Sequence, residues 1–171
     1  MLSRDRILGL FSELDDELCQ RNVKGDVFIV GGAAMAVAYE ARPATRDVDA
    51  IWHPSTEVRE AAARVAARHD DLDADWLNDG VKGFLPGDDR GERRVVYEGE
   101  CLAVAAGSPE YLLATKLLAS RVSRDEDDIL LLYALNGFST VDEGLALLER
   151  YYPGRPIEAK VRFFLEELIE S

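Results

Sequence analysis

One stretch near the N-terminus, residues 29–52, most limits what this chain of 171 residues can fold into. It reads IVGGAAMAVAYEARPATRDVDAIW: an apolar run, a Gly-Gly pair, a segment of small residues, and a second apolar run that contains Asp-Val-Asp. Short apolar runs rich in β-branched residues predict buried strands, and the alanine-rich segment between them favours a helix. The stretch therefore predicts a strand, a glycine turn, a short helix and a second strand.

Asp47 and Asp49 are unusual in a strand, because aspartate is a poor strand former. Side chains alternate along a strand, so both carboxylates point to one face while Val48 and Ala50 point to the other, toward a core. Neighbouring carboxylates repel unless water separates them or a cation lies between them, and oxygen ligands on a rigid strand suit Mg²⁺. The alternative is an edge strand whose outer face is only solvated.

Gly31 and Gly32 add a second kind of ligand to this picture. A strand followed by two glycines and a helix start presents bare backbone N–H groups, which favour phosphate, and the missing side chains let phosphate come close. A P-loop needs Gly-Lys-Ser/Thr and a Rossmann turn needs three spaced glycines, and neither pattern is present. A phosphate-binding turn beside a carboxylate pair indicates a site for a nucleotide with a metal ion.

The remaining patterns predict an α+β protein with a small mixed β-sheet flanked by helices and a helical C-terminal half. Strands are expected at residues 26–30, 46–52, 93–97 and 101–105, and helices at 3–22, 33–40, 55–69, 108–121, 125–136, 140–152 and 157–170. Ser108 followed by Pro109 is a helix start, and Thr140 with Glu143 forms a capping box. We expect an α/β core over residues 1–107, with a helical region over residues 108–171 packed on it as one compact unit.

The net charge of −13, from 20 basic and 33 acidic residues, argues against broad nonspecific binding of nucleic acid. A local basic groove stays open as an alternative to scattered, solvated charges. Its candidate residues are Arg42, Arg46, Arg90, Arg93, Arg94, Arg121 and Arg124.

Neither a membrane segment nor a signal peptide is predicted. No apolar run approaches the roughly 20 residues of a membrane helix, and the N-terminus has no cleavage-site pattern. We therefore expect a cytoplasmic protein. Cys19 and Cys101 stand far apart without a nearby Cys or His, so we expect no zinc site. We expect both to be free thiols that pack as small buried hydrophobes.

These motifs resemble the nucleotidyltransferase superfamily with the DNA polymerase β-like fold. The signature of that superfamily corresponds here to Val30-Gly31-Gly32 followed by Asp47-Val48-Asp49. The chain is more closely similar to a minimal bacterial branch, the AbiEii/MenT-type toxins of type IV toxin–antitoxin systems. That branch carries a later helix and an acidic motif, which match 108-SPEYLLATKLLASR-121 and 124-RDEDDI-129.

The resemblance implies a role for each matching residue. Gly31 and Gly32 would hold the phosphates of a nucleoside triphosphate (NTP), with Thr45 and Arg46 in reach. Asp47 and Asp49 would coordinate Mg²⁺ or Mn²⁺.

Further along the chain, Lys116 would neutralise triphosphate charge, and Asp128 (or Asp125) would complete the catalytic site. Asn78 and Lys82 would line the substrate side. The alternatives are a surface lysine at Lys116 and a solvated, acidic helix N-terminus at residues 125–128, where acids are favourable.

The implied activity is metal-dependent transfer of a nucleoside monophosphate from an NTP to a hydroxyl of RNA or of a protein. The leading candidate for the acceptor is tRNA. A toxin–antitoxin role with a cognate antitoxin would go with it. Polymerase-like members carry a third carboxylate on a later strand, whereas residues 101–106 contain no acid, and only Glu98 and Glu100 lie nearby. This departure favours an alternative, a catalytically degenerate binding or regulatory module. A third option is transfer to a cationic small molecule of the aminoglycoside type.

Overall fold

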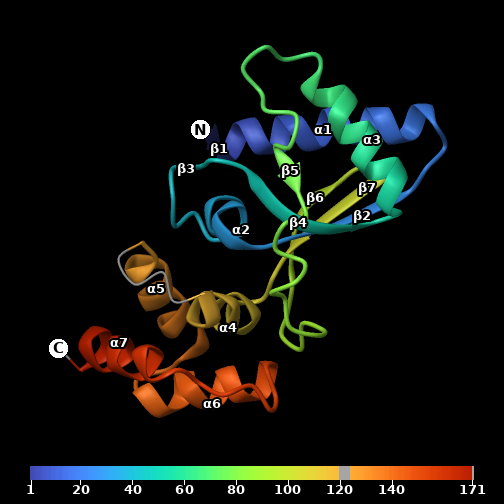
Figure 1. Cartoon of the computed structure of the whole chain (residues 1–171). Helices are drawn as coiled ribbons and strands as arrows, with labels where there is room; N and C mark the ends of the chain where they lie inside the picture. The colour runs from blue at the N-terminus through green and yellow to red at the C-terminus, as the bar shows by residue number, and fades with distance from the viewer. Residues whose placement is uncertain (120–123, 171) are drawn as a thin grey trace. The chain divides into compact units, whose positions relative to one another are not determined.

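The computed structural model describes residues 1–119 and 124–170, and the chain divides into two compact units (Figure 1). The first unit comprises Met1–Gly83 and Arg93–Ala106, and the second comprises Phe84–Glu92 and Gly107–Ser171. The first unit contains β1 (Leu2–Ser3), α1 (Arg4–Gln20), β2 (Gly25–Ile29), α2 (Gly31–Val37), β3 (Ala44–Thr45), β4 (Val48–His53), α3 (Ser55–Ala66), β5 (Leu77–Asn78), β6 (Arg94–Glu98) and β7 (Leu102–Ala106). The second contains α4 (Pro109–Ala119), α5 (Glu126–Asn136), α6 (Val141–Tyr151) and α7 (Ala159–Ile169).

A five-stranded mixed sheet in the order β5-β4-β2-β7-β6 forms the frame of the first unit. Strand β2 pairs antiparallel with β4 and parallel with β7, and β6 returns antiparallel to β7. The predicted α+β fold class is confirmed. The sequence patterns did not predict β1, β3 and β5, because two-residue strands are too short to show an alternating pattern.

Helices α1 and α3 lie against one face of the sheet (Figure 1). A Cβ atom added at Gly25 of β2 would lie 2.9 Å from Leu18 of α1 and 3.2 Å from Val58 of α3, so any side chain at this position would displace the Leu18 methyl group. Val27 and Ile29 continue on the same face and are buried. The opposite face carries Asp26, Phe28, Asp49, Ile51, Ala103 and Ala105, and we call it the groove face.

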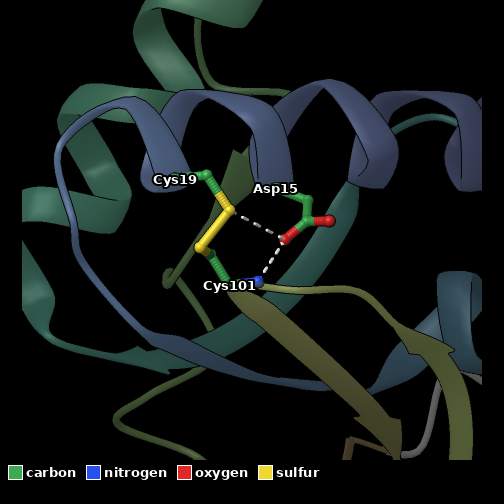
Figure 2. A group of neighbouring side chains, drawn as sticks. All are labelled: Asp15, Cys19 and Cys101. Carbon is green, nitrogen blue, oxygen red and sulfur yellow. Dashed lines mark hydrogen bonds between the residues drawn. A yellow bond between two sulfur atoms is a disulfide. The ribbon is translucent and has the colours of Figure 1, made fainter.

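The expectation of two free thiols is wrong, because Cys19 and Cys101 form a disulfide (Figure 2). They are 82 residues apart in sequence, but the C-terminal end of α1 brings their Cα atoms to 5.4 Å. Asp15, one turn earlier in α1, accepts a hydrogen bond of 2.7 Å from the Cys101 backbone N–H. It also accepts one from the Tyr97 hydroxyl at 3.1 Å, and burial raises the pKa of Tyr97.

Within the described residues, Asp15, Cys19 and Cys101 are the one group of three side chains close enough to share a metal ion. The disulfide removes both thiolates that such an ion would need. Asp15 is already engaged with two backbone N–H groups and the Tyr97 hydroxyl. The cluster therefore fastens α1 to the start of β7 and is not a metal centre.

Glu17 joins the two helices that cover the sheet. It is 6% exposed, and its carboxylate accepts hydrogen bonds from Arg64 of α3, at 2.8 Å, and from Arg68, which follows the C-terminal end of α3. The hydrogen bond from Arg64 is the main reason why the pKa of Glu17 lies below its usual value; burial opposes this effect and Arg68 adds to it. The ionised carboxylate is thus part of the packing between α1 and α3.

The second unit is built from its four helices and the segment Phe84–Glu92. Ser108 is fully buried and accepts from the Tyr111 N–H, which confirms the predicted helix start, and Asp89 binds both its hydroxyl and its N–H. The predicted capping box of Thr140 and Glu143 is also confirmed. The predicted end of the first of these helices, at Arg121, lies outside the described residues. Among the described helices, none has the length and hydrophobicity needed to span a membrane.

Replacing Glu17 with Gln should lower the free energy of unfolding of the first unit by about 2 kcal/mol at pH 7, because a charged hydrogen-bond acceptor is lost. A lowered pKa contributes stability above the unfolded value of 4.5, and this contribution is lost as the pH falls through the folded pKa. The difference between wild type and variant should therefore shrink below about pH 4.5. Urea unfolding followed by tryptophan fluorescence measures it, since Trp52 and Trp76 both lie in this unit.

The matched control is Glu60→Gln, which removes a half-exposed ion pair with Arg21 on the same two helices and should cost less than about 0.5 kcal/mol. A difference for Glu17→Gln that stays constant from pH 7 to pH 3 would contradict this account.

Candidate functional site

Gly31 and Gly32 are the first residues of α2, so the predicted glycine turn is the start of this helix. This glycine turn lies beside Asp49 of β4, because β2 and β4 run antiparallel. The register pairs Ile29 with Ala50, and the Val30 N–H donates to the Asp49 carbonyl at 2.9 Å. Gly31 follows with φ of 60°, and a Cβ added there would lie 3.1 Å from Asp49 Oδ2. Only glycine combines this backbone angle with such a close approach to the carboxylate.

Gly32 lies against Thr45 and Arg42. A Cβ at Gly32 would lie 2.7 Å from Thr45 Oγ1 and 3.9 Å from Arg42 Nη1. The backbone at Gly32 thus lies close to a hydroxyl and a guanidinium. Such a combination suits phosphate oxygens, which accept hydrogen bonds from N–H and O–H groups and pair with arginine.

Asp49 lies in β4 between Val48 and Ala50, which are fully buried, and Asp47 directly precedes the strand, which begins two residues later than predicted; both aspartates are partly exposed. Strand β5 pairs parallel with β4 and brings Asn78 opposite Asp49 in the register. Its side-chain amide donates to Asp47 Oδ2 at 3.3 Å. Asn78 therefore orients one carboxylate of the pair, a contact that the sequence patterns did not predict because β5 was not expected.

The donor chemistry of this pair fits a hard divalent cation. Carboxylate oxygens from a rigid strand, with room for water and phosphate oxygens as further ligands, are the usual environment of Mg²⁺. Ala103 and Ala105 are the side chains of β7 on the same face, so β7 supplies no third carboxylate. Glu98 pairs in register with Ala103 at the far end of that face, away from Asp49.

Two other predicted residues of the first unit lie outside this cluster. Arg46 is exposed, and within the described residues its side chain has no hydrogen-bond or ion-pair partner. Lys82 is exposed and lines a groove along the sheet. Arg42, predicted only as one candidate for a basic groove, lies beside Gly32. The two-residue strand β3 begins two residues after Arg42 and holds this segment of the chain in place.

In the second unit, Lys116, Asp125 and Asp128 form a buried cluster between α4 and α5. Lys116 is 7% exposed, and its ammonium lies 2.8 Å from Asp125 Oδ1 and 2.7 Å from Asp128 Oδ2. Asp128 is 2% exposed, so the alternative of a solvated helix N-terminus does not hold for this residue. The structure thus brings together the three residues that the resemblance assigns to the catalytic site, and the Lys116 ammonium forms ion pairs with both carboxylates.

A small mixed sheet with a glycine turn against a strand-borne aspartate pair defines the class of nucleotidyltransferase-like proteins. The family model described as "Nucleotidyltransferase of unknown function (DUF6036)" matches residues 5–136, and the chain belongs to this family. That description supports nucleotidyl transfer, with a nucleoside triphosphate as substrate. No curated protein and no solved structure matches the chain significantly.

Replacing Lys116 with Met should lower the free energy of unfolding of the second unit by about 3 kcal/mol, because Asp125 and Asp128 would be left buried without their cation. Adding Asp128→Asn to that variant should restore part of the loss, since one buried charge is then removed. Urea unfolding followed by far-UV circular dichroism measures both changes. A loss below about 1 kcal/mol for Lys116→Met would show that the cluster is solvated in solution.

Proposed function

We propose that the chain transfers a nucleoside monophosphate from an NTP to a hydroxyl, using Mg²⁺ or Mn²⁺ held by Asp47 and Asp49. The observation that carries the proposal is the close approach of Gly31 to Asp49: a Cβ added at Gly31 would lie 3.1 Å from the Asp49 carboxylate, so the backbone at the start of α2 runs directly beside that carboxylate. A bound divalent cation would offset the charge of the triphosphate oxygens and fix their position.

The residues of the chain divide this task among them. Backbone N–H groups at Gly31 and Gly32, with the Thr45 hydroxyl, hold the phosphates at the turn, and Arg42 or Arg46 adds positive charge. Asn78 keeps the Asp47 carboxylate oriented through its hydrogen bond. Positive groups at the phosphates stabilise the negative charge that develops on the departing pyrophosphate.

The proposed roles of Lys116 and Asp128 rest on the motif resemblance alone. The motif resemblance assigns Lys116 to the triphosphate and Asp128, or Asp125, to the catalytic site. The buried ion pairs of the second unit give these residues a structural role as well. A Lys116→Met variant that stays folded separates the two roles, because a triphosphate contact predicts weaker NTP binding in addition to lower stability.

The motif resemblance extends the proposal to the acceptor and the biological role. It implies a hydroxyl of tRNA or of a protein as acceptor, in the cytoplasm, and a toxin whose activity a cognate antitoxin restrains. The second candidate function, a degenerate binding module, is favoured by Ala103 and Ala105, which occupy the β7 positions where a third carboxylate would face the site.

Replacing Asp49 with Asn should lower nucleotidyl transfer by more than about 100-fold, because a carboxylate that holds the metal ion is lost. The assay mixes purified protein, Mg²⁺ or Mn²⁺ and each α-labelled NTP with total tRNA and with protein acceptors. Asp70→Asn, an exposed aspartate elsewhere in the first unit, is the control and should keep full activity. Growth arrest by the wild type but not by Asp49→Asn would support the toxin role.

Two results would contradict the proposal, the first its activity and the second its site. Absence of label on every acceptor, together with absence of metal-dependent NTP binding in calorimetry, would leave the degenerate module. Equal transfer by wild type and Asp49→Asn would place the chemistry elsewhere in the chain.

A further inference from the structure

A groove of about 540 Å³ runs along the groove face of the sheet. Its apolar floor consists of Phe28 of β2, Ile51 of β4 and Ala105 of β7, which the strand register places side by side in one row. The groove lies wholly within the first unit. It includes Lys82, which the motif resemblance places on the substrate side. Its volume is that of a ligand site.

The side chains on this face change character along the strands. Asp49 stands at one end, followed two residues later on β4 by the apolar row of Ile51 and Phe28. The next row across the sheet contains His53, Asp26 and Glu98, which the register aligns through Ala103. At the usual rise along a strand, these rows lie about 7 and about 13 Å from Asp49.

The chemistry of the proposed function determines what enters this groove. In an in-line displacement, the attacking oxygen and the departing oxygen lie on opposite sides of the phosphorus. Thr45 and Gly32 lie before Asp49 in the direction of β4, so pyrophosphate departs toward that end. The attacking hydroxyl therefore comes from the direction of Ile51 and His53, which is the groove. This step rests on the proposed function.

The charged side chains at the end of the groove farthest from Asp49 determine which acceptor binds there. Asp26 and Glu98 are exposed, and within the described residues neither carboxylate has a hydrogen-bond or ion-pair partner. By contrast, Asp79 on the rim is paired with Arg59 at 2.9 Å. The Arg93 guanidinium lies over the Phe28 ring, 4.5 Å from its centre, above the apolar row. The groove is also lined by the exposed Lys82, but the His53 row contains acidic side chains and no lysine or arginine. Two unpaired carboxylates in this row attract a cation and repel the phosphates of an RNA strand.

We propose that the groove binds the acceptor of the transfer reaction and that this acceptor is a basic segment of a protein. A Ser, Thr or Tyr hydroxyl would lie at the Asp49 end, and a Lys or Arg side chain of the same segment would reach Asp26 and Glu98. Exposed rim residues such as His53 and Val95 leave the groove open along its length, which suits an extended segment. The net charge of −13 attracts such a partner.

The reaction balances without a further reactant. The hydroxyl oxygen of the acceptor forms a bond to the α-phosphorus of the NTP, and the bond from that phosphorus to the bridging oxygen breaks. Pyrophosphate leaves with the electron pair, and the hydroxyl proton passes to solvent. The product is a nucleotidyl phosphodiester on the protein side chain.

The test compares two sets of synthetic peptides with the full chain. Each peptide carries one Ser, Thr or Tyr, flanked two residues away on either side by Lys in one set and by Glu in the other. With α-labelled NTP and Mg²⁺, the Lys set should be labelled with a kcat/KM at least about tenfold higher, given the usual strength of exposed ion pairs. Total tRNA is assayed in parallel.

The double variant Asp26→Asn/Glu98→Gln should reduce this preference to within about twofold and leave the KM for NTP unchanged, since both residues act on the acceptor alone. The matched control, Asp70→Asn/Asp75→Asn, removes the same charge at exposed positions elsewhere in the first unit and should keep the preference. Binding of fluorescent Lys and Glu peptides, followed by anisotropy, provides a readout that does not depend on turnover.

The outcomes separate the two proposals. Label on tRNA with unlabelled peptides, or equal labelling of both peptide sets, would overturn the acceptor assignment and leave nucleotidyl transfer intact. If no acceptor is labelled but NTP binds, equal anisotropy for both peptide sets overturns it, and a Lys preference lost in the double variant upholds it. Absence of both label and metal-dependent NTP binding would overturn the proposed function itself.

Discussion

The antiparallel register between β2 and β4 is the constraint on which the rest of the site depends. It pairs Ile29 with Ala50, so the turn that leaves β2 must pass the aspartates that enter β4. The hydrogen bond from the Val30 N–H to the Asp49 carbonyl joins the segment after β2 to β4 at this point. Because strand register has a period of two, a shift by one residue would turn both carboxylates into the core and Val48 into solvent. The burial of Val48 and Ala50 opposes that shift.

The same register divides the groove face into parts with different chemistry. The phosphate-binding turn and the carboxylate pair lie at one end, an apolar row crosses the middle, and unpaired acids stand at the other end. On the opposite face, the Glu17 carboxylate and the disulfide secure the helices that cover the sheet. One face is thus fixed by packing and covalent bonding. The other carries Asp26 and Glu98, which have no hydrogen-bond or ion-pair partner within the described residues, and exposed polar groups of this kind are where binding groups are expected.

Local patterns were sufficient for much of this account. The position of Asp49 between two buried neighbours follows from alternation alone, and the Thr140 capping box follows from a short motif. Gly31 and Gly32, predicted as a turn before a helix, are the first residues of α2. The features that were missed depend on long-range geometry. The disulfide joins residues 82 positions apart, and the Asn78 contact with Asp47 needs a two-residue strand that has no pattern. The groove is visible only once β2, β4 and β7 lie side by side, since each contributes single residues to it.

The central claim, that Asp47 and Asp49 hold a metal ion beside a phosphate-binding turn, has a direct test. A crystal of the full chain grown with Mn²⁺ and a non-hydrolysable NTP analogue would give an anomalous manganese signal. The account predicts that signal between the two carboxylates, with phosphate oxygens against Gly31 and Gly32. A triphosphate bound elsewhere, or manganese away from both aspartates under the same conditions, would contradict it.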